Sequence, residues 1–356
     1  MERKGRIDFL DGMRGLAIFT VIIYHYFAQI HGVARSDYYE AHPLVHYLYL
    51  SVPLFFVISG YVIFLTLDRT KDFTSFIVRR WIRLFPAMLI ASIVIPLVAL
   101  AFPYRLGGVP SLVDLLPGLT LLGANVISAL VGVETDGLEG SFWTVYVEVR
   151  FYLMFGVLYF VLGKQRAFYS LLSLSLLLLV LIKVAPMVAG SDALALQSVF
   201  GKMLIGYHLP WFLVGMYIYL YDLREQRWLA ALIAANALAY NADGAGEMIA
   251  TGLLLLLIYG AFTTTAVQAF FRSRFLMFMG FISYPLYLCH DSIGRGIVQA
   301  LQANFSRQLP FELFPPIAFV ALVIPAWYIA KYLEPAIQRW LKRRLLPPTL
   351  PEAAVA

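Results

Sequence analysis

Two residues of one apolar stretch are the first candidates for chemistry. Arg14 and His25 lie in 9–31, FLDGMRGLAIFTVIIYHYFAQIH, eleven residues apart. In a helix this spacing corresponds to a rotation of about 1100°, roughly 20° past three full turns, so both side chains share one face. They lie roughly 16 Å apart along the helix axis. A guanidinium and an imidazole placed in this way could bind an anion and move a proton. The alternatives are lipid headgroup contact for Arg14 and an interhelical hydrogen bond for His25.

Glu148 is a second candidate, in the stretch SFWTVYVEVRFYLMF that begins at residue 141. We expect it roughly 10 Å in from the outer end of its helix, at a depth similar to that of His25. The two are predicted to meet, because a carboxylate beside an imidazole fixes its tautomer and raises its basicity, as a base catalyst requires. Arg150 is two residues further on and faces elsewhere. The alternative is that Glu148 and Arg150 are structural polar links between helices.

Three arginines cluster where the predicted segment 80–102 begins. Arg83 follows Arg79 by four residues and Arg80 by three, so their side chains share a helix face. Guanidinium groups suit the oxygens of phosphates. Arg14 is expected at the same inner level, so four guanidiniums could converge on one polyanion. Contact with lipid headgroups, as in many cytoplasmic flanks, is the alternative.

Other polar residues are candidates for lining a cavity. Ser59 precedes Gly60 in FFVISGY, where close helix packing is favoured over substrate contact. Tyr287 and His290 share a helix face at i, i+3, with a buried polar network as the alternative. Their neighbours Tyr284, Asp291 and Arg295 add further polar groups. The only cysteine, Cys289, excludes an internal disulfide and a cysteine-rich metal site, and we predict no metal site.

The composition predicts an all-α, polytopic membrane protein. Hydrophobic residues make up 61% of the chain and charged residues 13%, against about 25% charged in soluble domains. Cores stop growing with chain length, so the excess indicates lipid-facing surface. We expect about ten transmembrane helices. They are 9–31, 44–67, 80–102, 141–163, 168–188, 203–221, 228–242, 247–268, 275–301 and 316–341.

The basic residues predict the orientation. With the N-terminus in the cytoplasm, 18 Lys and Arg fall in inner connections and 4 in outer ones, as the positive-inside rule requires. Both termini are then cytoplasmic, and the basic pI needs no nucleic acid partner. A cleaved signal peptide is the alternative for 9–31, but Asp11 and Arg14 interrupt its apolar run.

The chain is predicted to form one transmembrane domain, 1–346, followed by a disordered tail, 347–356. The apolar stretch 111–131 is expected to be re-entrant or interfacial, because Pro117, Gly118 and Gly123 make it a poor spanning helix. From the residues alone, the pattern indicates group transfer to a hydroxyl from a phosphate-rich donor. A proton-coupled secondary transporter of an organic anion is the alternative, and a non-catalytic interaction protein is a third.

Five motifs in order resemble the membrane acyltransferase type 3 family, the sugar and polysaccharide O-acyltransferases. They are Arg14 with His25 in LDGMRGLAIFTVIIYH, then VPLFFVISGYVI, then RRWIRLFP from Arg79 to Pro86, then Trp143-Thr144 with Glu148 before Phe151-Tyr152, and SYPLYLCH from Ser283 to His290. The chain departs from the family where many members have Glu-Glu-Gln, because it has Glu148, Val149 and Arg150. Only the first carboxylate of that motif is kept.

The resemblance implies an acyl-CoA co-substrate, most often acetyl-CoA, and no tightly bound cofactor. It implies transfer to a hydroxyl of a cell-surface or lipid-linked sugar, such as a polysaccharide or lipopolysaccharide. His25 would be the base, with Arg14 as partner and Glu148 as orienting group. Arg14, Arg79, Arg80 and Arg83 would hold CoA, while Ser59, Trp143, Tyr287 and His290 would line the cavity.

The resemblance also places the chain in the inner (cytoplasmic) membrane as a multi-pass protein in contact with the bilayer. Acylation of a macrolide or another small glycoside is an alternative within the family. Direct transfer and an acyl-histidine intermediate are both open, as are the acyl length and an oligomeric state that includes a homodimer.

Overall fold

The computed structural model describes residues 8–29, 42–184, 205–221, 223 and 226–346. Every regular element in this part of the chain is a helix, which confirms the predicted all-α class. The predicted tail, 347–356, lies outside the described residues.

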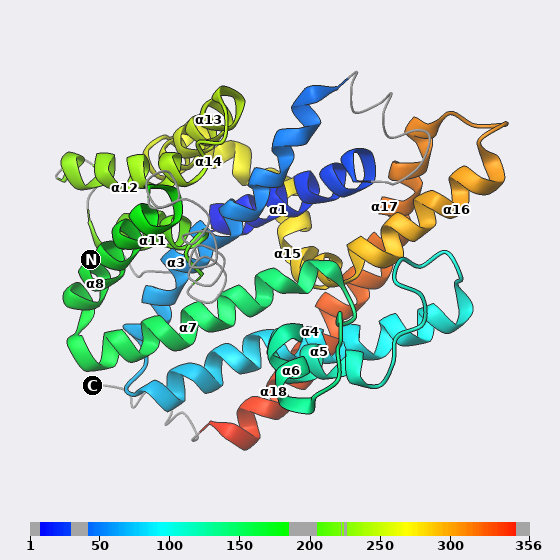
Figure 1. The fold of residues 1–356 in the computed structure, drawn as a ribbon, viewed down its shortest axis with the longest axis horizontal. Helices are drawn as coiled ribbons and strands as arrows, with labels where there is room; N and C mark the ends of the chain where they lie inside the picture. The colour runs from blue at the N-terminus through cyan, green and yellow to red at the C-terminus, as the bar shows by residue number, and fades with distance from the viewer. Residues whose placement is uncertain (1–7, 30–41, 185–204, 222, 224–225, 347–356) are drawn as a thin grey trace, which may run out of the picture.

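Figure 1 shows the arrangement of the helices. The first half comprises α1 (Asp8–Ile23), η1 (Tyr24–Ala28), η2 (Pro43–Leu50), α3 (Ser51–Leu67), α4 (Phe73–Ala101), η3 (Val113–Leu115), α5 (Leu116–Thr120), α6 (Ala124–Val131), η4 (Gly140–Phe142), α7 (Trp143–Leu162), α8 (Lys164–Leu179) and η5 (Val180–Val184). The second half comprises α11 (Leu209–Leu220), α12 (Arg227–Tyr240), α13 (Ala245–Thr263), α14 (Thr265–Phe271), α15 (Arg274–Cys289), η6 (His290–Gly294), α16 (Arg295–Phe305), η7 (Phe311–Leu313), α17 (Phe314–Tyr328), η8 (Ile329–Leu333) and α18 (Glu334–Leu345).

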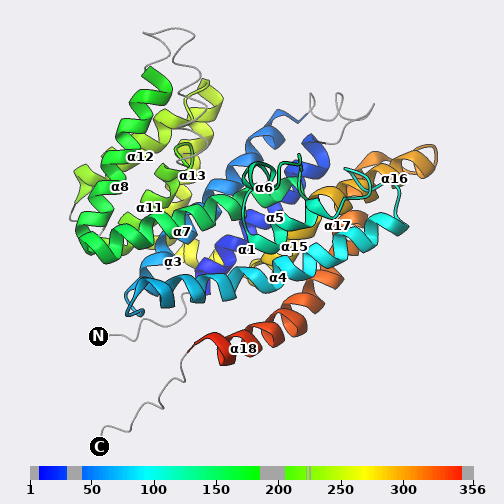
Figure 2. The same cartoon turned by 60° about the horizontal axis from the view of Figure 1, so that its bottom comes forward.

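Helix α1 lies at the centre and packs most extensively against α15, with α3 on another side. Glycines allow the backbones of α1 and α15 to touch. A Cβ on Gly15 would lie 1.9 Å from the carbonyl oxygen of Leu276, and one on Gly280 would lie 1.9 Å from that of Asp11. Small residues at such contacts let van der Waals packing hold membrane helices together. Helices α8, α12 and α13 gather at one end of the molecule, and α16 and α17 at the other (Figure 2).

Six of the predicted membrane segments are confirmed as helices long and apolar enough to cross a bilayer. They are Pro43–Leu67, Phe73–Ala101, Gly140–Leu162, Lys164–Lys183, Ala245–Thr263 and Phe311–Leu345. Helix α11 is apolar but shorter. The total of ten and the side on which the termini lie stay predictions. The stretch 111–131 forms only short helices, of which α5 has 5 residues and α6 has 8, so it is too short to span.

Two π-helical turns interrupt the central pair of helices. Helix α1 ends at Ile23 and continues as η1, which carries His25. Helix α15 ends at Cys289 and continues as η6, which carries His290 and Asp291. Such turns are rare and occur frequently at functional sites. The two turns lie against each other, since the hydroxyl of Tyr26 donates to the carbonyl oxygen of His290 at 3.1 Å.

Candidate active site

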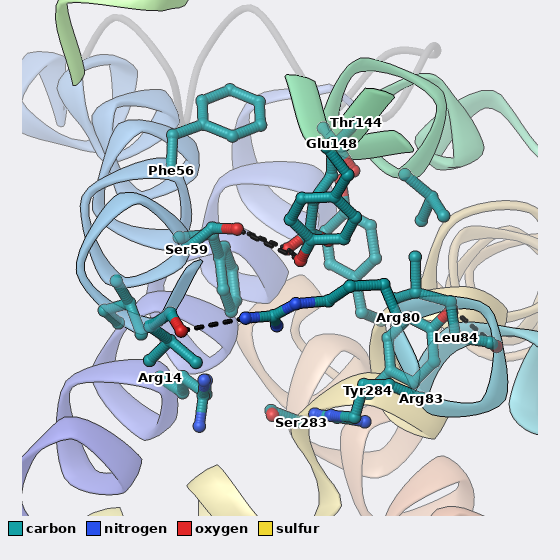
Figure 3. Close-up of a pocket in the computed structure, with 16 residues that line it drawn as sticks. Arg14, Phe56, Ser59, Arg80, Arg83, Leu84, Thr144, Glu148, Ser283 and Tyr284 are labelled. Carbon is teal, nitrogen blue, oxygen red and sulfur yellow. Dashed lines mark hydrogen bonds between the residues drawn. The ribbon is translucent and has the colours of Figure 1, made fainter. Parts of the chain in front are cut away.

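A chamber lies inside the bundle, between α1, α3, α4, α7 and α15 (Figure 3). We call it the inner chamber, and its volume is about 120 Å³. Its walls combine charged, hydroxyl and aromatic side chains. They are Arg14, Phe55, Phe56, Ile58, Ser59, Val62, Arg80, Arg83, Leu84, Thr144, Val145, Glu148, Tyr152, Ser283, Tyr284 and Tyr287.

A second and larger cavity continues from the inner chamber. This vestibule has a volume of about 590 Å³ and reaches α18. The two cavities share part of their lining: Arg14, Val62, Arg83, Ser283 and Tyr284. The vestibule adds Asp11, Arg69, Glu334 and Gln338, among others. The larger vestibule and the smaller inner chamber therefore adjoin at Arg14 and Arg83.

Glu148 projects into the inner chamber from α7. Its Oε1 atom accepts a hydrogen bond of 2.6 Å from the Ser59 hydroxyl on α3 and another from the Tyr152 hydroxyl (Figure 3). Tyr152 follows Glu148 by four residues, so both lie on one face of α7. Ser59 therefore contacts the carboxylate of Glu148 in the chamber. The predicted close packing is present at its neighbour Gly60, where a Cβ would lie 2.1 Å from the carbonyl oxygen of Phe212.

The predicted pairing of His25 with Glu148 is wrong. The carboxylate beside His25 is Asp291, whose Oδ1 lies 3.6 Å from Nδ1 of His25. The reason is local: the regular helix ends before His25, and the π-helical turn changes the direction of its side chain relative to Arg14. Arg14 lines the chamber and the vestibule, whereas His25 lines neither.

Asp291 is held in place from two sides. It accepts a 2.8 Å hydrogen bond from Nη1 of Arg295, whose Nη2 donates to the carbonyl oxygen of Gln29 at 2.7 Å. The His25 ring also meets the ring of His290 edge-on, with 4.8 Å between centroids. His25 is thus surrounded by a carboxylate, a guanidinium and a second imidazole.

Tyr287 forms the wall between the inner chamber and His25. It lines the chamber, and its ring lies 5.2 Å from that of His290, which in turn packs on His25. Its hydroxyl donates to the Ser141 carbonyl at 3.1 Å and accepts from Thr144 at 2.9 Å. His290 is fully buried behind this wall, so of the two only Tyr287 faces the chamber as predicted.

Three of the four predicted arginines converge on the cavities. Arg14 pairs with Asp11 at 3.0 Å, and Arg83 with Glu334 at 3.2 Å. The side chain of Arg83 is 44% exposed, while Arg80 is buried. Arg79 is exposed and lines neither cavity, because the chamber faces the side of α4 that carries residues 80 and 83. Arg79 therefore has no cavity contact that supports a role in donor binding, and that role stays a prediction.

Trp143 lies at the start of α7, outside the lining of the inner chamber. It is 41% exposed, and its ring lies 5.0 Å from that of His208 and 6.3 Å from that of Phe56. Phe56 lines the chamber. Trp143 is therefore one residue removed from the cavity that it was predicted to line.

The sequence reasoning missed three residues of this site: Tyr152, Asp291 as the partner of His25, and Glu334. Tyr152 had a readable signal, since it lies one helical turn from Glu148. Asp291 is adjacent to His290, but its contact with His25 joins residues that are far apart in the chain. Glu334 had no local signal, because its partner Arg83 is 251 residues away.

Arg80 has a structural role in addition to lining the chamber. Its Nη2 atom donates to the Val62 carbonyl at 2.8 Å and to the Thr66 hydroxyl, and its guanidinium lies 4.9 Å from the Tyr152 ring centroid.

We expect Arg80→Ala to lower the free energy of unfolding by about 1–3 kcal/mol, because charge-assisted bonds that join α4 to α3 are lost. Denaturant unfolding in detergent measures this. Arg79→Ala is the matched control, expected within about 0.5 kcal/mol of the wild type, and equal losses in both would contradict the assignment.

Comparison with known proteins bears on the chemistry of this site. Residues 7–330 match the family described as an acyltransferase domain. Searches of curated proteins and of solved structures found no match. The matched range contains all lining residues of the inner chamber and those of the vestibule up to Ala330. It also contains His25, Asp291 and the arginines of α4. The chain therefore belongs to the acyltransferase 3 family and is a membrane acyltransferase.

Proposed function

We propose that this protein transfers a short acyl group, most simply acetyl, from acyl-CoA to a hydroxyl of a cell-surface or lipid-linked sugar. The observation that carries the proposal is the pair of connected cavities, in which guanidinium groups at the junction lead to a narrow chamber. Family membership supports the acyl transfer, and the cavities support the donor.

The phosphates of CoA fit the vestibule better than the chamber. Arg83 is partly exposed there, and Arg14 and Arg69 line the same space. Guanidinium groups recognise phosphate oxygens through paired donors. The chamber beyond them is about 120 Å³, against about 590 Å³ for the vestibule. This difference favours a slender thioester arm with a short acyl chain over a long fatty acyl chain.

His25 is the base in this proposal, and Asp291 replaces Glu148 as the carboxylate that orients it. His25 takes the proton of the acceptor hydroxyl while the oxygen attacks the thioester carbon. The carbon–sulfur bond breaks, and its electron pair leaves on the sulfur of CoA. The wall formed by Tyr287 must open for the two substrates to meet, since it separates His25 from the chamber.

We place the vestibule on the cytoplasmic side of the inner membrane. Helix α18 lines it and ends with Lys342, Arg343 and Arg344, and such clusters favour the cytoplasmic face. The acceptor would then approach the far end of α1, near the exposed ring of Trp143.

Purified protein with radiolabelled acetyl-CoA and a mixed glycan-lipid fraction tests this function. The expected result is labelled glycan together with free CoA. A hydroxylamine-labile label on the glycan identifies an ester, and a deletion strain analysed by mass spectrometry identifies the acceptor. CoA release no higher than without protein, together with solute uptake into proteoliposomes, would instead support the transporter.

A further inference from the structure

Five buried polar atoms gather at the end of α1 that is remote from the vestibule. We call the residues that carry them, together with Asp291, the distal cluster: His25, Glu139, His290, Asp291, Ser292 and Arg295. The atoms are His25 Nδ1, Glu139 Oε2, His290 Nε2, Ser292 Oγ and Arg295 Nε, and none has a hydrogen-bond partner in the described structure. Buried polar groups are rarely left unpaired in folded proteins unless water or chemistry accounts for them. Their concentration around the proposed base indicates a site for proton transfer.

Two carboxyl groups of the distal cluster, those of Glu139 and Asp291, lie on segments that contact each other. Oε1 of Glu139 accepts a 2.9 Å hydrogen bond from the backbone nitrogen of Ser292, the residue after Asp291. Gly140 makes the approach possible, because a Cβ at this position would lie 2.7 Å from Oδ2 of Asp291. Glu139 is 5% exposed and Asp291 is 7% exposed. Two neighbouring buried carboxyl groups do not both ionise easily, so one of them tends to keep its proton.

Burial, and then the negative charge of Asp291, raise the pKa of Glu139 to about 8. The Ser292 hydrogen bonds and the charge of Arg105 act in the opposite direction. The titratable and charged groups that face Glu139 are Asp291 on η6, Arg105 after α4, Tyr26 on η1, and Tyr287 and Cys289 on α15. At neutral pH the proton of the pair therefore resides mostly on Glu139.

This shift has a consequence for stability. Folding raises the pKa of this carboxyl from 4.5 to about 8. Between these two pH values the folded state binds more protons than the unfolded state, so the stability of the fold decreases as the pH rises through this window. Glu139→Gln removes the effect. We compare the melting temperatures of the variant and the wild type at each pH. The difference, variant minus wild type, should become more positive from pH 5 to pH 9. Glu134→Gln, an exposed carboxylate of the same connection, should show no such trend, and a constant difference for Glu139→Gln would contradict the shift.

The charges of the distal cluster show what the proton of Glu139 can do. With neutral His25, protonated Glu139, ionised Asp291 and Arg295, these four groups carry no net charge. A proton on His25 would leave one uncompensated positive charge in a buried place, which is costly. Loss of the proton of Glu139 restores the balance, and the charge of Arg105 favours the ionised form.

We propose that Glu139 releases its proton to the side remote from the vestibule each time His25 takes the proton of the acceptor hydroxyl. Glu139 is thus a positioning residue that acts on His25 through Asp291, and this role rests on the proposed function. The ester bond forms, the carbon–sulfur bond breaks, and CoA leaves as a thiolate that is protonated from the vestibule side. His25 then passes its proton through Asp291 to Glu139, which resets the cluster. Each turnover delivers one proton to the remote side.

Infrared spectroscopy of the purified protein tests the cluster without any substrate. The carbonyl stretch of a protonated carboxylic acid should be present at pH 6 and disappear as the pH is raised past about 8. Glu139→Gln should abolish this band, and Asp291→Asn should lower its pH midpoint, because the neighbouring negative charge is gone. Glu134→Gln should leave it unchanged. A band that persists in Glu139→Gln, or a midpoint that is unchanged in Asp291→Asn, would overturn the protonated Glu139 and its coupling to Asp291.

The pH profile of acyl transfer tests the role of Glu139 in turnover. We expect Glu139→Gln to lower kcat roughly tenfold to a hundredfold, to change the shape of the pH profile and to leave CoA affinity unchanged. Loss of a residue with only a structural role would lower kcat by the same factor at every pH. That outcome, or a kcat equal to that of the wild type, refutes the role. If the wild type transfers no acyl group, the proposed function fails and the turnover role with it, while the infrared titration still decides whether Glu139 keeps its proton at neutral pH under the influence of Asp291.

Discussion

His25→Ala is expected to lower the rate of acyl transfer by about 10²- to 10⁴-fold, the range typical of a general base. The reason is that His25 lies beside the carboxylate of Asp291, at 3.6 Å, which Arg295 holds in place by an ion pair of 2.8 Å. CoA affinity should stay at the wild-type value, because His25 lines neither the inner chamber nor the vestibule. Rates from labelled acetyl-CoA and CoA titration by calorimetry measure the two quantities separately.

Asp291→Asn makes this prediction more specific. The change keeps the size of the side chain but removes the charge that orients His25, so the rate should fall by less than in His25→Ala. His46→Ala is the matched control, because His46 lies in η2, outside both cavity linings, and should transfer at the wild-type rate. A His25→Ala variant that keeps its rate, or that loses rate and CoA affinity together, would exclude His25 as the base.

Arg83→Ala and Glu334→Gln are expected to change CoA affinity in opposite directions. Arg83 is 44% exposed in the vestibule, and its ion-pair partner is Glu334. Loss of the guanidinium removes a charge-assisted contact worth about 1.5–3 kcal/mol, so the Kd for CoA should rise by about ten- to a hundredfold. Glu334 competes with the phosphates for Arg83, so its neutralisation should tighten CoA binding. Calorimetric titration of the purified variants measures both values.

Two comparisons make the donor prediction decisive. Arg79→Ala removes an arginine of the same helix that lines neither cavity, so its Kd should equal that of the wild type. In the double variant Arg83→Ala with Glu334→Gln, the gain from Glu334→Gln should vanish, because its target is absent. Weaker CoA binding in Glu334→Gln, or equal losses in Arg79→Ala and Arg83→Ala, would show that the vestibule does not hold the phosphates.

Several features followed from the sequence because they depend on local spacing or on composition. The excess of apolar residues determined the helical membrane class, since lipid leaves the backbone few ways to satisfy its hydrogen bonds. The i, i+3 spacing placed Arg80 and Arg83 on one face of α4, and both line the inner chamber. Glu148 was predicted to lie inside the bundle from its depth in an apolar run, and it projects into the same chamber.

The partners of these residues were decided only by the tertiary structure. The regular spacing of a helix predicted that Arg14 and His25 act from one face, but η1 ends this regularity one residue before His25. Asp291 and Glu334 reach their partners from segments more than 200 residues away, as in the 251-residue separation of Arg83 and Glu334. Periodicity reports which way a side chain points on its own helix. Which charge it meets depends on how the helices pack, and the backbone contact of α1 with α15 at Gly15 and Gly280 sets that arrangement here.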